Sequence, residues 1–530
     1  MKRRGFFRKA LTFTLTAAAL ALTACGSSQT QGGAVSQDGT TDKVVTYATS
    51  TVWDGFNYFA TTNTNTDEVI EFLYDKLFDM NADGTIQPRL ANSYEVNGTY
   101  DVYTLHLNEN SYWHDGEKVT ADDVVYTLQL ASTADQSWVR RDTIIAGTDD
   151  NGVELSEDSI EVKALDDYTV QFTLKAPTDE LTFLTDLKYW FIVPKHILGQ
   201  YADADILTAG YWDAPVASGP LKFDSQIQGE RFELVKFDNY YLGAVDFDRL
   251  VVRVMDASAI TAGIMSGEVD FTKSLVALDV KSLENTGNYV IESIPSFAYQ
   301  NLVINLSDSL FNDEKVRVAI AKAVNRQSIV DNIYLGYGQV INSLYPESHP
   351  YYNSEVTSQY DPDGAKKLLE EAGWDFNTVI EFQVPTGNEA RVQSSLLIQQ
   401  DLEAVGIKTS IVSYDFATVL QNMRDEKFQI MLMGAEGTAA PNSYTGTITY
   451  FSHTTDEEIL ADINNGAAVL TYNEKKGYYD DLQLLLIERA PILYMYSPNS
   501  LIVHSTRISA DFTKLNVNMN KQIWTWKIDK

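Results

Sequence analysis

Residues 112–123 bring a histidine and several carboxylates close together in the sequence. They read Tyr-Trp-His-Asp-Gly-Glu-Lys-Val-Thr-Ala-Asp-Asp. A histidine beside acidic side chains is a common source of a general acid, a general base or a metal ligand. His114, Asp115 and Glu117 are therefore the first candidates for chemistry in this chain.

The spacing within the same stretch also has a purely structural interpretation. Asp115-Gly116 is a turn signal, because glycine tolerates positive φ. Thr120 precedes Asp123 by three residues, the spacing of a capping box at a helix N-terminus. The stretch predicts a turn followed by a helix, with His114 hydrogen-bonded in the turn. A ligand-contacting or catalytic His114 is the alternative.

No complete catalytic or metal motif occurs elsewhere. Gly-x-Ser-x-Gly, His-Glu-x-x-His and Gly-x-x-x-x-Gly-Lys are all missing, and the six histidines never lie three to five positions apart. Residues 79–90 are spaced like a calcium loop, but Leu90 stands where a bidentate glutamate is needed, so we predict a hairpin turn. We expect no catalytic residue, no metal and no cofactor. An extracellular hydrolase is the competing class.

The N-terminal residues indicate export from the cytoplasm. Basic residues between Lys2 and Lys9 precede an uncharged segment, Ala10–Ala24, of roughly 15 residues, too short for a permanent membrane span. We predict a signal peptide over residues 1–24. The pair Arg3-Arg4 leaves open whether the general secretory or the twin-arginine route is used.

The signal peptide ends in a motif similar to a bacterial lipobox. Leu-Thr-Ala precedes Cys25, the only cysteine of the chain, whose thiol would carry a diacylglycerol. A single cysteine also excludes an intramolecular disulfide framework. Residues 25–42 are polar and rich in Gly, Ser and Gln, so we predict a lipid-anchored flexible linker.

Charge and length restrict the possible partners and architecture. The formal net charge is -33, and such a surface repels nucleic acid and anionic lipid headgroups. We therefore expect no nucleic-acid partner. A chain of 530 residues is too long for one ordinary core, so two to four lobes are expected.

The predicted elements change character along the chain. Strands dominate the first 300 residues, and the period-2 pattern places them at 44–48, 99–107, 159–164, 169–174, 232–237 and 249–255. Beyond residue 361 helices and strands alternate. Asp361 caps a helix that starts at Pro362 and ends before Gly373. Further helices are predicted at 389–405 and 417–425, and strands at 379–384, 407–412 and 428–433. This alternation indicates an α/β lobe with a largely parallel sheet, and a cleft between two lobes.

Motifs spread over nearly all of residues 44–510 resemble the family 5 extracellular solute-binding proteins of ABC transporters, the oligopeptide, dipeptide and nickel binders. The motifs that carry the resemblance are Pro88 to Glu95, Tyr103 to Leu107, Trp113 to Tyr126, Ser218 to Leu221, Asn239 to Gly243, Gly263 to Asp270, Phe311 to Arg317, Val324 to Arg326, Tyr360 to Pro362, Gly373-Trp374 and Ile398 to Ile407.

The resemblance implies an α/β, two-lobed periplasmic-binding-protein-like fold of type II, cluster C, with an extra domain inserted in the first lobe. The implied division is 43–72 plus 206–300 plus 500–530 for the first lobe, 73–205 for the inserted domain and 301–499 for the second lobe.

The resemblance also implies a function without chemistry. Family members capture a ligand by closing their lobes and deliver it to permease subunits driven by a separate ATPase. A peptide or peptide-like ligand is expected, with a sugar or a metal chelate as the alternative. We expect a monomer on the outer face of the bacterial cell membrane, anchored by the lipid on Cys25. A sensory binding protein for the same ligand is a further alternative.

One loop departs from the peptide-binding members. They hold the ligand α-amine with an Asp in a Gly-Trp-x-x-Asp motif, where this chain has Ala435 for the Trp and Thr438 for the Asp. A buried ammonium without its counter-charge loses about 2–5 kcal/mol of affinity. Either Glu436 takes over the amine, or the ligand is a blocked peptide, a sugar or another polar molecule held by Thr438, Asn442 and Tyr444.

Four further residues are candidates for the ligand site. Arg391 lies near the position where dipeptide binders keep an arginine for the ligand carboxylate, with a surface helix arginine as the alternative. Trp53, Phe56 and Asn57, in the first strand-to-helix crossing, either line the cleft or pack in the core.

Overall fold

The computed structural model divides the chain into two units, Met1–Asp42 and Lys43–Lys530. It describes residues 42–50, 53, 55–60, 69–81, 83–133, 142–187, 190–283, 287–357, 360–512 and 522–529. The predicted signal peptide and Cys25 lie outside these residues, as does the linker except for its last residue, and they stay predictions. Within the described part, no helix is both long and apolar enough to cross a membrane.

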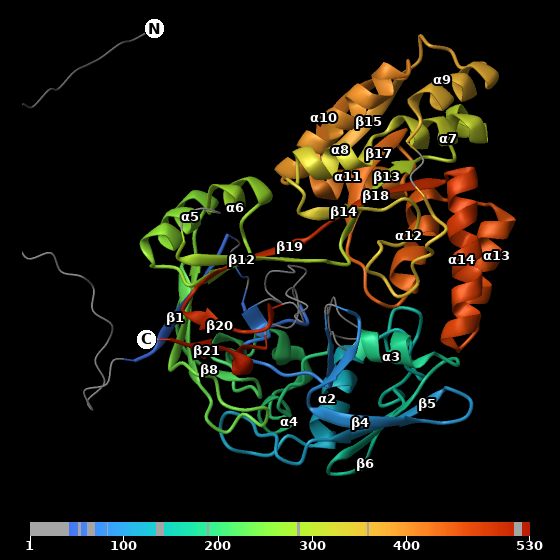
Figure 1. Ribbon diagram of the computed structural model, residues 1–530. Coiled ribbons are helices and arrows are strands. Elements are labelled where there is room, and N and C mark those ends of the chain that lie inside the picture. The colour runs from blue at the N-terminus through green and yellow to red at the C-terminus, as the bar shows by residue number, and fades with distance from the viewer. Residues whose placement is uncertain are drawn as a thin grey trace, which may run out of the picture. The chain divides into compact units, whose positions relative to one another are not determined.

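A seven-stranded sheet is the centre of the first lobe (Figure 1). Strand β1 runs parallel to β10 and β11, and all other neighbours are antiparallel. In sheet order the strands are β12 (Tyr289–Ile294), β19 (Ser500–Ser505), β11 (Phe271–Thr272), β1 (Val44–Thr49), β10 (Arg249–Val254), β9 (Arg231–Lys236) and β8 (Leu221–Ile227), with helices α5 (Ala257–Ser266) and α6 (Ala277–Leu283). The strands predicted at 44–48, 232–237 and 249–255 are confirmed to within one residue.

A four-stranded antiparallel sheet is inserted between β1 and β8. Its order is β4 (Ala91–Val96), β5 (Val102–Leu107), β7 (Thr169–Thr173) and β6 (Val162–Asp166). The same part of the chain contains hairpin β2 (Phe78–Met80) and β3 (Ile86–Pro88), helices α2 (Ala121–Ser132), α3 (Glu180–Leu187) and α4 (Lys195–Leu198), and the 3₁₀ turns η1 (Asp203–Thr208) and η2 (Gly210–Asp213). Buried side chains of this sheet, such as Tyr103, join one hydrophobic core with Val45 and Leu250 of the first. The insert is therefore stabilised together with the first lobe rather than separately.

The histidine stretch is a turn and a helix cap, as predicted. The backbone N–H of Thr120 donates to the Asp123 carboxylate at 2.9 Å, where α2 begins. His114 Nε2 donates to the Gly219 carbonyl at 3.0 Å, and its Nδ1 accepts the Ala217 N–H at 3.2 Å. Burial lowers the pKa of His114 to about 3, so the imidazole is neutral at physiological pH and both nitrogens are occupied.

A six-stranded sheet is the centre of the second lobe. Its order is β14 (Gly338–Val340), β18 (Ile492–Pro498), β13 (Tyr299–Ile304), β17 (Ile430–Ala435), β15 (Val379–Pro385) and β16 (Lys408–Tyr414). The helices around it are α7 (Glu314–Ala323), α8 (Arg326–Asn332), α9 (Pro362–Glu371), α10 (Glu389–Ala404), α11 (Phe416–Arg424), α12 (Asn442–Ser452), α13 (Glu457–Ala468) and α14 (Tyr472–Arg489), with a 3₁₀ turn η3 (Ser309–Phe311). The lobe boundaries implied by the resemblance stay predictions.

This sheet corrects one expectation from the sequence. Only the β15–β16 and β15–β17 pairs are parallel, whereas β13 is antiparallel to both of its neighbours and β14 to β18. The helix-strand alternation beyond residue 361 holds for β15, β16 and β17, whose connections contain α10 and α11. The helix-strand pattern did not reveal β13 and β18, which are separated in sequence by nearly 190 residues. The chain enters β13 from the first lobe and returns to the first lobe after β18. The sheet is therefore mixed, not largely parallel.

Helix α9 begins and ends where the sequence predicts. The Asp361 carboxylate accepts the backbone N–H of Gly364 at 2.9 Å, with Pro362 as the first helical residue. Gly373 follows the helix with φ of +67°, a conformation that favours glycine.

Two crossing segments join the lobes. The chain passes from β12 to β13 and returns from β18 to β19 (Figure 1). Ser296 Oγ donates to the Pro498 carbonyl at 2.6 Å, and Ser497 Oγ donates to the Ser296 carbonyl at 2.9 Å. The crossings are thus hydrogen-bonded to each other where they pass between the lobes.

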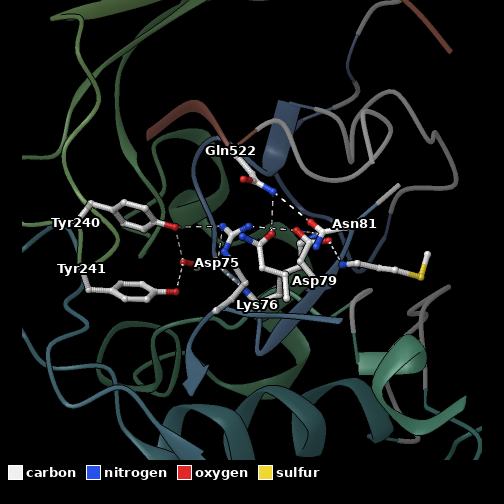
Figure 2. A network of polar contacts seen from close by, with 10 residues as sticks. Asp75, Lys76, Asp79, Asn81, Tyr240, Tyr241 and Gln522 are labelled. Carbon is white, nitrogen blue, oxygen red and sulfur yellow. Dashed lines mark hydrogen bonds and ion pairs between the residues drawn. The ribbon is translucent and has the colours of Figure 1, made fainter. Parts of the chain in front are cut away.

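A buried ion-pair network fixes the β2–β3 hairpin (Figure 2). Arg89 contacts Asp75 at 2.8 Å and Asp79 at 3.1 Å, and Lys76 contacts Asp79 at 3.3 Å. Tyr240 and Tyr241 donate their hydroxyls to Asp75. The stretch spaced like a calcium loop is thus the predicted hairpin, and its Asp79 is paired with cations of the protein.

The C-terminal segment, residues 522–529, contacts this network. Gln522 Nε2 contacts Asn81 Oδ1 at 3.3 Å and Gln87 Oε1 at 3.1 Å, and the Arg89 guanidinium lies 4.5 Å from the Trp524 ring centre. The segment continues through η5 (Ile523–Thr525) to β21 (Lys527–Ile528), which pairs with β20 (Ile508–Ser509).

Candidate functional site

The predicted ligand residues of the second lobe gather where β17 ends. Gln300, at the start of β13, pairs with Gly434, and Tyr299 pairs with Ala435. Helix α10 starts nearby, after β15. In α/β sheets, ligands bind beyond the carboxyl ends of the parallel strands, and β15 and β17 both end here.

Arg391 points from the first turn of α10 toward this edge. Its Nε donates to Gln300 Oε1 at 2.9 Å, while Asn388 caps the helix by accepting the Arg391 backbone N–H at 2.9 Å. Burial lowers the pKa of Arg391, and nearby Tyr496 and Tyr334 offset part of that effect. No carboxylate among the described residues forms an ion pair with it. Arg391 is therefore a half-buried cation held beside a sheet edge, not a surface helix arginine.

Gly434 leaves space for this arginine. A Cβ atom at position 434 would lie 2.3 Å from Gln300 Nε2 and 2.6 Å from Arg391 Nη2. Any side chain there would push both groups away. The glycine at the start of the altered loop is thus needed for the position of Arg391.

Thr438 forms hydrogen bonds mainly within its own loop. Its hydroxyl accepts the Ala440 N–H at 3.2 Å, its backbone N–H donates to Ser443 Oγ at 2.8 Å, and its carbonyl accepts from His349 Nε2 at 3.0 Å. The side chain is buried, with 5% exposure. Thr438 therefore stabilises the loop and is poorly placed to replace a charged amine receptor.

The remaining residues of this loop divide into buried and exposed ones. Tyr444 is fully buried, donates its hydroxyl to the Phe297 carbonyl at 2.8 Å, and stacks on Tyr299 with ring centres 4.4 Å apart. Burial raises its pKa well above the usual range. Asn442 and Glu436 are exposed, and the Glu436 charge acts on both tyrosines. Glu436 is thus the acidic group that this loop presents to solvent.

The first-lobe candidates lie in a different environment. Trp53 and Phe56 are buried and pack edge-on against Phe232, with ring centres 4.8 and 5.6 Å apart. Among the described residues, no contact joins them to Arg391. The core alternative therefore describes these two rings. Asn57, next to Phe56, keeps a buried Oδ1 that has no hydrogen-bond partner in the described part of the chain.

Sequence reasoning missed two residues that shape this edge. Gln300 orients Arg391, and His349 fixes the Thr438 carbonyl while stacking on Tyr345 at 4.1 Å. Burial lowers the pKa of His349 to about 3, so it is neutral at physiological pH. Neither residue belongs to a short motif, and only the pairing of distant segments could have identified them.

The described residues contain no group of three or more His, Cys, Asp or Glu side chains that could hold a metal ion.

The two lobes touch beside the altered loop. A Cβ atom on Gly84, at the tip of the β2–β3 hairpin, would lie 2.6 Å from the Ala439 side chain. Asp179, just before α3, pairs with Lys475 of α14 at 3.2 Å, with side-chain exposures of 9% and 4%. This ion pair joins the insert to the second lobe and depends on the lobes staying together.

Asp179→Asn is expected to weaken ligand binding about tenfold or more. Asn keeps the acceptor for the Thr182 N–H but leaves Lys475 buried without its counter-charge whenever the lobes meet. Asp480→Asn is the matched control, because Asp480 pairs with Lys476 within α14. Calorimetric titration would measure both variants. Equal affinities would show that the pair contributes nothing to closure.

Comparisons with known proteins agree on one family. The profile of the bacterial extracellular solute-binding proteins, family 5 Middle, matches residues 85–458. The dipeptide-binding protein of Escherichia coli K12 is 28% identical over 499 residues, covering 88% of this chain and 90% of that protein. The oligopeptide-binding protein AppA of Bacillus subtilis is 28% identical over 477 residues, covering 84% of both.

The fold agrees with solved structures as well. The ABC transporter substrate-binding protein CtaP from Listeria monocytogenes superposes with a TM-score of 0.82 at 23% identity, covering 92% of this chain and all of that one. The two-lobed α/β fold expected from the sequence is thereby confirmed. The chain belongs to family 5 of the bacterial extracellular solute-binding proteins of ABC transporters.

Proposed function

We propose that this chain is the substrate-capturing lipoprotein of an ABC importer for peptides or peptide-like solutes. Its similarity to a dipeptide-binding and an oligopeptide-binding protein supports this ligand class. Permease subunits receive the solute, and a separate ATPase chain drives them, since this sequence lacks the phosphate-cradling motif. The protein acts as a monomer without catalysis or cofactor, anchored outside the cell membrane by the lipid on Cys25.

The position of Arg391 is the observation that carries the proposal. A guanidinium presents parallel N–H donors that match a carboxylate in a bidentate pair. Its Nε is engaged by Gln300, and the described residues offer the Nη groups no carboxylate. A ligand carboxylate would supply the missing counter-charge, so we assign Arg391 to the carboxyl end of the solute.

The opposite end of the solute is recognised more weakly. Thr438 is neutral, and its hydroxyl is already hydrogen-bonded within the loop. Glu436 is the exposed carboxylate of this loop, and water would screen any ion pair that it forms with a ligand amine. We therefore propose that the site requires a free carboxylate and tolerates a blocked amino end. Asn57 and Asn442 complete the proposed set of ligand contacts, whereas Tyr444 is buried and supports the loop from below.

Native mass spectrometry of residues 43–530, followed by denaturation, tests the ligand class first. Masses spaced by amino-acid residues would support a peptide carrier. A single sugar or metal-chelate mass would overturn the proposal.

The recovered peptide then allows a sharper test with capped analogues. Amidation of the carboxyl terminus is expected to weaken binding by at least about 30-fold, because Arg391 loses its counter-charge. Acetylation of the amino terminus is expected to cost less than about tenfold. Titration calorimetry of the two analogues provides the comparison. The reverse order of sensitivity would contradict the assignment of the two ends.

A further inference from the structure

A second arginine is buried inside the second lobe, at a helix that carries none of the proposed ligand contacts. Arg326 is the first residue of α8 and is 5% exposed. Its Nε is buried without a hydrogen-bond partner, and no described residue forms an ion pair or side-chain hydrogen bond with its guanidinium. By contrast, Arg89 and Arg489 are each paired with carboxylates.

Arg326 lines a small cavity that is partly open to solvent. The cavity has a volume of about 10 Å³, room for roughly one particle the size of a water molecule. Besides Arg326, its wall includes Asn342, Ser343, Ala321, Leu486 and Tyr494, and none of the lining residues is acidic. All of them lie between residues 321 and 494, which the predicted division assigns to the second lobe.

The polar groups in the wall are not satisfied by the protein alone. Asn342 lines the cavity and its Oδ1 is buried without a partner among the described residues; exchanging the oxygen and nitrogen of this amide would put a donor in that position. Ser343 Oγ donates to the Gln483 carbonyl at 2.6 Å, so its hydroxyl proton is already used. The residues that line the cavity thus include a cation and an amide that can donate or accept a hydrogen bond, but no acidic side chain.

A buried cation without a counter-charge is strongly unfavourable, because it loses its hydration. Desolvation by burial lowers the pKa of Arg326 to about 10, which still leaves the side chain charged at physiological pH. The positive charge therefore persists in the folded protein. A counter-ion or ordered water must compensate for it.

We infer that the cavity at Arg326 binds one small monovalent anion of the halide class, with chloride as its occupant. The small volume of the cavity favours a monatomic anion over phosphate or a larger carboxylate. The net charge of -33 repels anions from the surface in general, so an anion is retained only where the local charge is positive and partly desolvated. The anion neutralises Arg326 and stabilises the packing of α8 against β14 and β18.

Thermal unfolding of the protein in sodium chloride and in sodium gluconate at equal ionic strength tests this site. Because an anion bound only to the folded state raises the melting temperature by mass action, chloride is expected to raise it by about 1–2 °C for each tenfold increase in concentration. Arg326→Met should abolish this dependence, and Arg424→Met, at an exposed arginine of α11, should keep it.

Bromide replaces chloride in a measurement that needs no variant. Crystals grown in sodium bromide are expected to show an anomalous scattering peak beside the Arg326 guanidinium. The inference would be wrong if the crystals showed no such peak and the melting temperatures in chloride and gluconate were equal. The cavity would then hold only water.

Discussion

Arg391→Gln is expected to weaken binding of the captured solute by about 2–5 kcal/mol, or roughly 1.5 to 3.5 decades in Kd. Gln keeps a hydrogen-bond donor near Gln300 but removes the charge that faces the ligand carboxylate. Arg424→Gln, an exposed helix arginine, is the matched control and should bind like the unaltered protein. Titration calorimetry with the peptide recovered from the protein measures both variants.

The amidated peptide shows whether Arg391 contacts the ligand carboxylate directly or whether the substitution weakens binding by disturbing the surrounding structure. If Arg391 binds the carboxylate, the variant and the amide each remove the same interaction, so their effects will not add. Additive losses would indicate that Arg391 acts elsewhere. Without ligand, Arg391→Gln should leave the free energy of unfolding unchanged or slightly higher, because it removes a desolvated charge. A variant that loses both affinity and stability would instead point to a structural role.

Cys25→Ser is expected to abolish incorporation of labelled fatty acid and to move nearly all of the mature-sized protein from the membrane fraction to the soluble fraction. Each buried methylene of an acyl chain contributes about 0.8 kcal/mol to membrane binding, so loss of two chains removes the anchor. Because Cys25 is the only cysteine, no second thiol can take the lipid. Ser27→Ala, two positions further on, serves as the control.

Measuring lipid incorporation and fractionation together makes the outcome clear. Loss of the label with release of the mature chain supports the anchor. A mature-sized Cys25→Ser protein that stays with the membrane would show that another interaction holds it there. Residues 43–530 form a unit of their own, so the fold should not change with the anchor.

Local patterns in the sequence were sufficient for much of the secondary structure. The Asp361 cap, the Gly373 stop and the Thr120–Asp123 cap each depend on residues within a few positions of one another. The strands near 44–49 and 249–254 follow from alternating polarity alone. Predictions from such short-range patterns hold in the folded protein because tertiary contacts rarely disrupt a cap or a turn whose hydrogen bonds are already formed.

The candidate site could be anticipated only in outline. The resemblance directed attention to Arg391 and Thr438, but it did not reveal that one reaches Gln300 and that the other is bonded within its loop. Gln300 and Arg391 are 91 positions apart. No spacing rule links such distant residues, since their contact depends on which strands become neighbours.

Sequence patterns thus predicted export and were sufficient for the net negative charge, the family and most local elements, because each depends on composition or on neighbouring residues. The folded chain alone decided the direction of β13 and β18, the Asp179–Lys475 contact and the unpaired charge of Arg326. These features depend on segments brought together from across the chain. Burial then determines whether a charge there is paired, exposed or in need of a ligand.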